Sequence, residues 1–365
     1  MKRPASIPSD PAAVGPRGAR TTAGRLAGAL LVGLLGGALF AVLGLPLAWL
    51  LGAMFATTLA SLSGRSLEVP AIVRLPVMVI LGVLIGASFT ADRLAAVSSW
   101  IPSAALLLLY VPTVGFVCLL YLRRTARLAP VTAYFAAAPG GLSEMVLMAE
   151  RSGADMRTVA LVHTVRVLLI VSVAPFLVTL AGGDGGVVSP AASRIDWGEL
   201  ALLGVTGGVG AWIATRLGLP AAAFFGGMAA SALVHLVGLA EGSVPGPLLA
   251  AAQLVLGASI GSRFRSMHPI TVLRQMLVGC GLTLLMFAVT FLFAALAHLL
   301  TGLSFVALVL AYVPGGVTEM GLVALALGVD PAFVATHHLV RILIVVTFAP
   351  LLLPVWRRIG GGRSR

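Results

Sequence analysis

A Pro-Gly-Gly element that occurs twice restricts the possible folds of this chain more than any other feature of its sequence. The first copy begins at Pro139 and continues to Glu144 and Met145, and the second copy begins at Pro314, 175 residues later. From Pro139 to Pro175, 18 of 37 positions are identical at this offset, without a gap. A repeat of this length predicts a duplicated half-protein, as in many transporter folds, because solenoid units are far shorter.

The composition predicts that the lipid bilayer is the main partner of the chain. Hydrophobic residues make up 59% of the sequence and charged residues only 10%, whereas about 25% charged residues are usual in soluble domains. The formal net charge of +12 comes from arginines in short connections between apolar runs. This placement is typical of topology signals and does not predict direct binding of nucleic acid.

Apolar segments predict an all-α integral membrane protein, since each is close to the ~20 residues that a helix needs to cross the hydrocarbon. In the first half the segments lie at 24–43, 46–63, 71–89, 100–122 and 157–180. Their copies in the second half lie at 198–217, 220–239, 246–262, 270–299 and 332–356. The resulting domains are a flexible basic cytoplasmic tail (1–23), two membrane repeats (24–181 and 197–356), a polar linker (182–196) and a basic cytoplasmic tail (357–365).

The arginines predict that the two halves have opposite orientations in the membrane. A sixth apolar stretch in each half, 131–150 and 304–327, contains the Pro-Gly-Gly element. If this stretch is re-entrant, each half crosses five times, and the arginine-rich connections should change sides between the halves. They do change sides: the first-half set is Arg65, Arg123, Arg124 and Arg127, and the second-half set is Arg263, Arg265 and Arg274. The sequence therefore favours inverted repeats of five spans each, with both termini in the cytoplasm.

The re-entrant segments are the predicted working site, because non-helical backbone at membrane depth is tolerated only where it is buried in protein or lines a watery cavity. Pro139 and Pro314 interrupt the helix, and the free N–H groups of the half-helix that follows suit an anion. Pro175 and Pro350 are predicted to kink the last helix of each half. The residues predicted to bind a substrate or ion are Gly140, Gly141, Ser143, Glu144, His163, Arg166, Gly315, Gly316, Thr318, Glu319, His338 and Arg341.

Two interpretations of the charged residues stay open at this stage. Glu144 and Glu319 either cap their own half-helices or exchange a coupling proton with the nearby histidines. Arg166 and Arg341 either pair with these glutamates to hold each hairpin or receive a substrate anion. Glycines of the apolar segments, among them Gly36, Gly52, Gly82 and Gly257, are predicted to be close helix contacts.

The doubled Pro-Gly-Gly-[Leu/Val]-[Ser/Thr]-Glu-Met motif, followed in each half by Gly-x-Asp and His-x-x-Arg, resembles the bacterial AbrB-type membrane duplication family. The likeness covers about residues 24–356. It implies a multi-spanning inner-membrane protein that is labelled a regulator of gene expression or an ammonia monooxygenase. The paired hairpins are also similar in plan to those of glutamate- and citrate-type sodium symporters, but the Gly-Gly-x-Gly tip of those proteins is missing here, so sodium coupling is not predicted.

We expect a secondary transporter that moves a small solute by alternating access. An anion is one candidate solute, and a proton is a candidate coupling ion. The alternative is a membrane sensor that regulates gene expression indirectly. We do not expect an enzyme, a cofactor or a metal site, because the few histidines and carboxylates near the motif come with two arginines that would repel a metal cation. An oligomer is compatible with the sequence.

Overall fold

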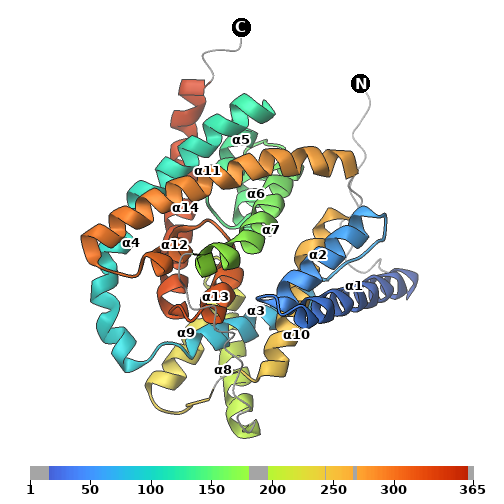
Figure 1. Cartoon of the computed structure of the whole chain (residues 1–365), viewed down its shortest axis with the longest axis vertical. Helices are drawn as coiled ribbons and strands as arrows, with labels where there is room; N and C mark the ends of the chain where they lie inside the picture. The colour runs from blue at the N-terminus through green and yellow to red at the C-terminus, as the bar shows by residue number, and fades with distance from the viewer. Residues whose placement is uncertain (1–15, 181–195, 243, 266–268, 361–365) are drawn as a thin grey trace.

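The computed structural model describes residues 16–180, 196–242, 244–265 and 269–360, and every regular element in these ranges is helical. The first half contains α1 (Pro16–Val42), α2 (Ala48–Leu62), α3 (Ala71–Gly86), α4 (Ala91–Tyr121), the short η2 (Leu122–Ala126), α5 (Pro130–Ala137), α6 (Leu142–Arg151) and α7 (Met156–Leu180). The second half contains α8 (Trp197–Arg216), α9 (Ala222–Leu236), α10 (Gly246–Gly261), the short η3 (Ser262–Phe264), α11 (Pro269–Thr301), α12 (Phe305–Tyr312), α13 (Val317–Ala326) and α14 (Pro331–Gly360). Figure 1 shows this all-helical architecture, which is the predicted class.

Seven helices of the described ranges are long and apolar enough to cross a membrane. They are α1, α4 together with η2, α7, α8, α10 together with η3, α11 and α14. The helices α2, α3 and α9 have 15, 16 and 15 residues. At about 1.5 Å per residue, each is some 22–24 Å long, less than the ~30 Å hydrocarbon core. The expectation that every segment has the length of a bilayer is therefore wrong for these three helices.

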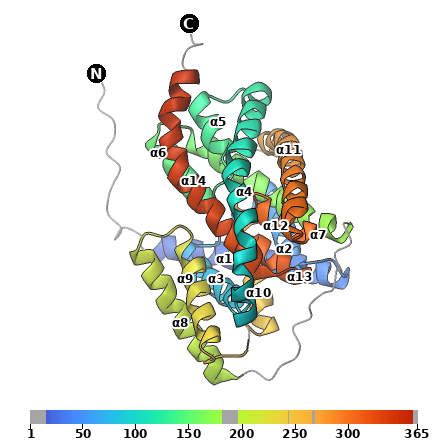
Figure 2. The same ribbon diagram turned by 90° about the vertical axis from the view of Figure 1, so that its left-hand side faces the viewer.

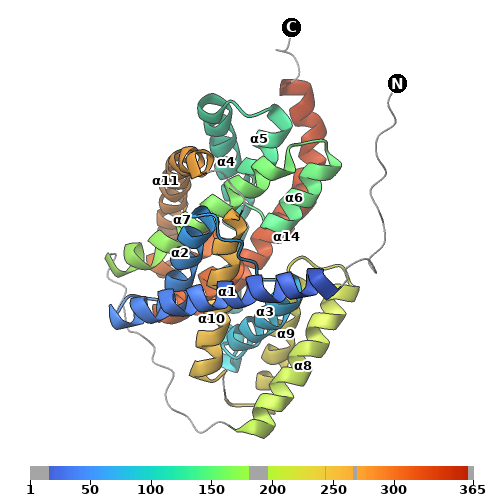
Figure 3. The ribbon, with the colours of Figure 1, turned by 90° about the vertical axis from the view of Figure 1, so that its right-hand side faces the viewer.

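The helices form two bundles, and each bundle contains helices of both halves of the sequence. The first bundle contains α1–α3 and α8–α10, and the second contains α4–α7 and α11–α14 (Figures 1 and 3). The bundles meet where α2 and α3 contact α7, α13 and α14. The two halves of the sequence are thus interleaved in space.

The first bundle is held together by close helix crossings that occur in matching pairs. A Cβ added at Gly82 of α3 would overlap the carbonyl oxygen of Phe224 in α9, and one added at Gly257 of α10 would overlap that of Leu50 in α2. Gly36 and Gly52 likewise bring the backbones of α1 and α2 into contact. The prediction that these glycines are close helix contacts is confirmed.

An ion-pair cluster around Glu68, which lies in a connection outside the spanning segments, joins three elements of the first bundle. Glu68, in the connection between α2 and α3, accepts hydrogen bonds from Arg25 at 3.3 Å and from Arg265. The hydrogen bond from Arg265 is the main reason why the pKa of the Glu68 carboxyl lies below its usual 4.5. The cluster therefore links α1 to the connection that follows η3.

In the second bundle, the long helices α4 and α11 pack against each other. Helix α4 also contacts the short helix α5, and α11 contacts the short helix α12. Figure 2 shows α4, α5 and α14 together on one side of this bundle, and all three are in mutual contact. This arrangement places the segment between α5 and α6 beside α14, which belongs to the other half of the sequence.

The predicted domain boundaries differ from the helices at both ends of the chain. Helix α1 begins at Pro16, inside the predicted tail 1–23, because a proline is favourable in the first turn of a helix and the residues after it can extend that helix. Helix α14 continues to Gly360, beyond the predicted start of the C-terminal tail at 357. Most of the linker 182–196 and the outer parts of both tails lie outside the described residues.

Candidate functional site

The first Pro-Gly-Gly element lies in a helix break at residues 138–141, between α5 and α6. Ala138 has φ −59° and ψ 133°, and Gly141 has φ −68° and ψ 146°, so both are extended. The residue before a proline is disfavoured in the helical region, and Pro139 has no N–H to continue the helix. The break is therefore encoded locally.

The second Pro-Gly-Gly element lies in a break of the same conformation at residues 313–316, between α12 and α13. Val313 has φ −54° and ψ 130°, and Gly316 has φ −72° and ψ 142°. Each break follows a helix of 8 residues and precedes a helix of 10 residues. The two elements thus have closely matching local structures.

Arg166 of α7 holds the first break through backbone carbonyl groups. Its Nη1 donates to the carbonyl oxygen of Ala138 at 2.9 Å, and its Nη2 donates to that of Gly140 at 3.0 Å. His163 Nε2 lies 2.9 Å from the carbonyl oxygen of Phe135, and His163 Nδ1 lies 3.0 Å from Arg166 Nη2. Because a carbonyl oxygen only accepts, His163 is a neutral imidazole that carries its hydrogen on Nε2 and accepts from the arginine at Nδ1.

Arg341 of α14 holds the second break in the same way. Its Nη1 donates to the carbonyl oxygen of Val313 at 2.7 Å, and its Nη2 donates to that of Gly315 at 3.0 Å. His338 Nε2 donates to the carbonyl oxygen of Leu310 at 3.0 Å, and its Nδ1 lies 3.3 Å from Arg341 Nη2. The His-x-x-Arg motif is therefore the device that ties each break to the long helix that follows it.

The expected pairing of glutamate with arginine is wrong for the described residues, since no ion pair joins these groups. Each glutamate instead folds back onto the glycine that precedes its own helix. A Cβ added at Gly141 would overlap the Glu144 carboxylate, and one at Gly316 would overlap the Glu319 carboxylate. This is the position of the glutamate in a capping box, three residues after the N-cap. The capping interpretation, which the sequence left open, fits this geometry.

Among the predicted site residues, the hydroxyl groups differ between the two copies. Thr318 is buried and its Oγ1 donates to Glu319 Oε2 at 2.7 Å, whereas Ser143 is exposed. Gly140 and Gly315 leave no room for a side chain, because a Cβ would meet the methionine five residues later in each case. The glycines of both breaks are therefore needed for packing.

Pro175 and Pro350, which were predicted to interrupt the last helix of each half by a kink, do not end that helix. Helices α7 and α14 continue through them to Leu180 and Gly360. Each proline removes one backbone hydrogen bond, but helices packed against neighbours in a membrane tolerate this loss. Pro139 and Pro314 differ because two glycines follow them and weaken the next turn.

The two arginines are buried charges without a carboxylate partner among the described residues. Each is only 2% exposed. Their Nη atoms bond to carbonyl oxygens and histidine nitrogens, while the Nε atoms of both have no hydrogen-bond partner in this part of the chain. Gly140, whose carbonyl oxygen accepts from Arg166, packs against Val345 of α14, one turn after Arg341. An unpaired buried charge is unfavourable by several kcal/mol, on the order of the loss when one member of a buried pair is removed.

A buried hydroxyl network beside the second break was not found from the sequence. Tyr110 Oη lies 2.9 Å from Thr290 Oγ1, and the ring of Tyr110 stacks on that of Tyr312 with centroids 5.3 Å apart. Tyr312 Oη donates to the carbonyl oxygen of Ser103 at 2.7 Å, and Ser103 Oγ lies 2.9 Å from His337 Nε2. The repeat gave no signal for these residues because the corresponding positions of the other half hold different ones, for example Gly115 in place of Thr290.

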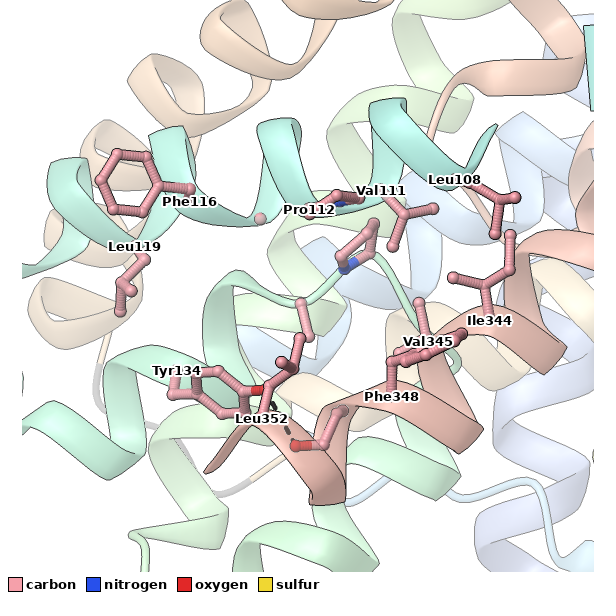
Figure 4. Close-up of a pocket in the computed structure, with 14 residues that line it drawn as sticks. Leu108, Val111, Pro112, Phe116, Leu119, Tyr134, Ile344, Val345, Phe348 and Leu352 are labelled. Atoms are coloured by element: carbon pink, nitrogen blue, oxygen red, sulfur yellow. Dashed lines mark hydrogen bonds between the residues drawn. The ribbon is translucent and has the colours of Figure 1, made fainter. Parts of the chain in front are cut away.

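An apolar cavity of about 520 Å³ lies beside the first break, between α4 and α14. Figure 4 shows the two helices facing each other across it, and the hydroxyl of Tyr134 that donates to the carbonyl oxygen of Ala349 at 2.8 Å. Ala138 and Pro139 of the break belong to its lining. The first break therefore borders this cavity, whereas the residues of the second half that correspond to Pro112 and Gly115 of its lining are Phe287 and Thr290, which are buried.

In the described ranges, no group of three histidine, cysteine, aspartate or glutamate side chains is placed to hold a metal ion. The chemistry that the site offers is hydrogen-bond donation and positive charge. Its donors are two guanidinium groups and the hydroxyls of the network beside them.

Comparison with known proteins gives one family and two relatives. The family described as transition state regulatory protein AbrB matches residues 49–357. A Bacillus subtilis (strain 168) protein, "Uncharacterized protein YhjN", is 33% identical over 242 residues, which are 60% of this chain and 62% of that protein. An Escherichia coli (strain K12) protein, "Putative regulator AbrB", is 27% identical over 322 residues, which are 86% of this chain and 91% of that protein.

Proposed function

The chain belongs to the AbrB family, and from this premise we propose that it is a secondary transporter of a small anionic solute, which binds between the two Pro-Gly-Gly breaks. The observation that carries the proposal is the pair of buried arginines without a carboxylate partner in the described residues. Charged side chains inside a membrane protein are typical of substrate pathways because their burial is otherwise unfavourable. An anion that enters between the breaks would neutralise them.

The proposed architecture is an inverted repeat of five spans per half, with α5–α6 and α12–α13 as re-entrant hairpins. The matched crossings of Gly82 with Phe224 and of Gly257 with Leu50 support it, because a two-fold axis exchanges contacts in this reciprocal way. Inverted repeats place that axis in the membrane plane. The arginine distribution then puts both termini on the cytoplasmic side of a bacterial inner membrane.

We propose that the moving bodies are the two bundles and not the two halves of the sequence. The first bundle is tightly packed through its glycines, while the second carries both breaks and both arginines. Because the arginines are 2% exposed, a solute can reach them only when packing around the second bundle loosens. Alternating access would then consist of shifts of the second bundle against α2 and α3.

In this proposal the glutamates and not the histidines carry any coupling proton. Both histidines already use Nε2 as a donor and Nδ1 as an acceptor, so neither is free to exchange a proton without breaking a bond to the break. The carboxylate of Glu144 lies against Gly141, and that of Glu319 lies against Gly316 and accepts a hydrogen bond from Thr318. If uptake by the Glu144→Gln, Glu319→Gln double variant keeps the proton dependence of the wild type, this part of the proposal is wrong.

Uptake into proteoliposomes tests the transport proposal. Purified protein would be reconstituted and offered labelled short carboxylates, inorganic oxyanions, ammonium and a neutral sugar under a pH gradient. We expect uptake of at least one anion, reduced about ten-fold or more in Arg166→Lys, since lysine keeps the charge but cannot bond to both carbonyls as a fork. Arg216→Ala, which removes an exposed arginine at the end of α8, serves as the control and should not change uptake. Uptake of ammonium but of no anion would contradict the proposal.

A second candidate function is a membrane sensor that acts indirectly on gene expression, and the printed name of the Escherichia coli relative is the observation that favours it. The two functions separate in a deletion strain whose transcripts are measured after complementation. If the Arg166→Lys variant is folded, does not transport and yet restores the wild-type transcript pattern, regulation is independent of transport.

A further inference from the structure

The donor groups at the two breaks narrow the chemical class of solute, an inference that rests on the proposed function. The first break lies against the helix that carries the second arginine, because Gly140, whose carbonyl oxygen accepts from Arg166, packs against Val345 of α14, one turn after Arg341. In the described residues neither guanidinium group has a carboxylate within ion-pair distance. Both Nε–H groups are buried and have no partner there. The site thus offers two positive charges and two uncommitted charged donors.

The Tyr110–Thr290 pair adds a neutral donor to this set. The two hydroxyls lie 2.9 Å apart, and one of them donates to the other. Two hydroxyl groups carry two hydrogens, and this bond uses only one, so one hydrogen is left for a ligand. The ring of Tyr110 stacks on Tyr312, whose carbonyl oxygen is 3.5 Å from Arg341 Nη1. On the same helix as Tyr110, Gly115 lies beside Pro139 of the first break, which Arg166 holds. The hydroxyl pair therefore lies beside Arg341, and Tyr110 belongs to a helix that contacts both breaks.

The site also lacks what a zwitterion needs. An ammonium group requires an acceptor with negative charge, but the carboxylates of Glu144 and Glu319 lie against the glycines that precede their own helices, and in the described residues neither forms an ion pair with Arg166 or Arg341. The carbonyl oxygens of the breaks already accept from the arginines. An amino acid would leave its ammonium group unpaired, and an unpaired buried charge is strongly unfavourable.

We propose that the solute is a small divalent oxyanion without an ammonium group, such as a short dicarboxylate or a sulfate-type ion, bound by Arg166, Arg341 and the Tyr110–Thr290 hydroxyl pair. Two charges on the solute match the two guanidinium charges. Its oxygen atoms accept from the Nε–H groups and from the free hydroxyl hydrogen. The hydroxyl pair contributes to specificity because it donates to a further oxygen atom, which a monocarboxylate such as acetate lacks once its two oxygen atoms bind the guanidinium groups.

Calorimetric titration of the full-length protein in detergent tests this inference with four probes: succinate, sulfate, acetate and aspartate. We expect succinate or sulfate to bind at least about ten-fold more tightly than acetate, which corresponds to about 1.4 kcal/mol, and aspartate to bind no better than acetate. The contrast between succinate and sulfate distinguishes a dicarboxylate from a compact inorganic ion. Aspartate or acetate binding as tightly as the divalent probes overturns the inference and leaves anion transport standing, whereas no binding of any anion overturns both.

Removal of one hydroxyl tests the role of Tyr110 separately. Tyr110→Phe keeps the ring that stacks on Tyr312, and we expect it to weaken binding of the divalent probe several-fold while acetate binding changes less. Tyr121→Phe is the matched control, because Tyr121 also lies on α4 and also bonds to α11, through the carbonyl oxygen of Val278 at 3.1 Å. It should bind all four probes as the wild type does. An equal loss in both variants, or an equal loss for acetate and the divalent probe in Tyr110→Phe, overturns the specificity role.

Discussion

The two Pro-Gly-Gly breaks have nearly the same backbone and the same arginine anchor, but their surroundings differ. Helix α13 after the second break is buried over eight of its residues, Val317 to Ala324. Helix α6 after the first break buries only Met145 and Ala149, and Ser143 at its start is exposed. The first break borders a cavity of about 520 Å³, while the second is covered by stacked tyrosines. One backbone device is thus used once in an open setting and once in a closed one.

This difference has a meaning if the chain is a transporter of the proposed kind. Two equivalent hairpins in unequal surroundings are what one state of an alternating-access cycle looks like, with one hairpin accessible and the other sealed. In the opposite state the surroundings would be exchanged. Paired substitutions at matching positions of the two breaks test whether the two surroundings differ in their contribution to stability.

The largest expected difference in thermal stability is between the Arg341→Ala and Arg166→Ala variants. Either variant leaves two backbone carbonyl groups without their donor, at about 1–3 kcal/mol for each buried group. The loss should be greater for Arg341→Ala because α13, which follows the second break, is buried over eight residues, whereas α6 buries two, so the first break can shift more easily after its donor is removed. The apparent thermal midpoint in detergent measures both. A greater loss for Arg166→Ala would mean that the first break is the more rigid one.

The next expected difference concerns the cavity. Gly115→Thr places at the first break the residue that Thr290 represents at the second, and a Cβ at Gly115 has room, with Pro139 Cδ at 3.8 Å as its nearest neighbour. We expect its thermal midpoint to stay near that of the wild type. Thr290→Gly removes the partner of Tyr110, opens a cavity and places a glycine inside α11, with an expected loss of about 2–3 kcal/mol. Equal effects would show that the two surroundings are energetically alike.

A smaller difference is expected between Gly316→Ala and Gly141→Ala. In each variant the new methyl group displaces the glutamate carboxylate that lies on the glycine. Glu144 is half-buried and can move outward, whereas Glu319 is 7% exposed and cannot. Gly316→Ala should therefore lower stability by about 1–3 kcal/mol, as overpacking does, and Gly141→Ala by less. In the Gly316→Ala background, Glu319→Ala should restore part of the loss, and additive losses would argue against the contact.

The smallest expected effect concerns the Glu68 ion-pair cluster of the first bundle, which contains neither break. The pKa of Glu68 is lowered in the folded protein, so the stability it contributes is present above its ordinary pKa of 4.5 and is lost as pH falls below 4.5 through the lowered value. Exposed ion pairs contribute about 1 kcal/mol or less. Between pH 7 and pH 4 the thermal midpoint of Glu68→Gln should therefore fall slightly less than that of the wild type. An identical fall in both proteins would remove Glu68 as a pH-sensitive contact.

The sequence predicted the helical elements and the local part of the site because both depend on neighbouring residues. The ten apolar segments coincide with helices, and the spacing of His163 and Arg166 placed both on one face of α7. The sequence did not predict which acceptors Arg166 and Arg341 use. A buried arginine can bond to a carboxylate or to backbone carbonyl groups, and every residue has a carbonyl group, so the sequence does not distinguish them. The Glu144 position three residues after Gly141 was the signal for a capping box.

Long-range contacts that differ between the halves were also beyond the sequence. Tyr110, Thr290 and Tyr312 come from three helices, and none of them has an equivalent in the other half. A repeat identifies residues that are shared, so residues that make the two halves different are hidden by the same comparison. His337, which belongs to the network beside the second break, is another example, because the corresponding residue of the first half is Val162.

The exchanged contacts of α3 with α9 and of α10 with α2 have a consequence for how the protein is made. During synthesis, α2 and α3 enter the membrane before any residue of their partners has left the ribosome. The glycine-containing faces of α2 and α3 must therefore contact lipid until α9 and α10 have been inserted. Two fragments separated between α7 and α8 should each insert, yet only joint expression should yield a compact protein, because neither fragment holds a complete bundle.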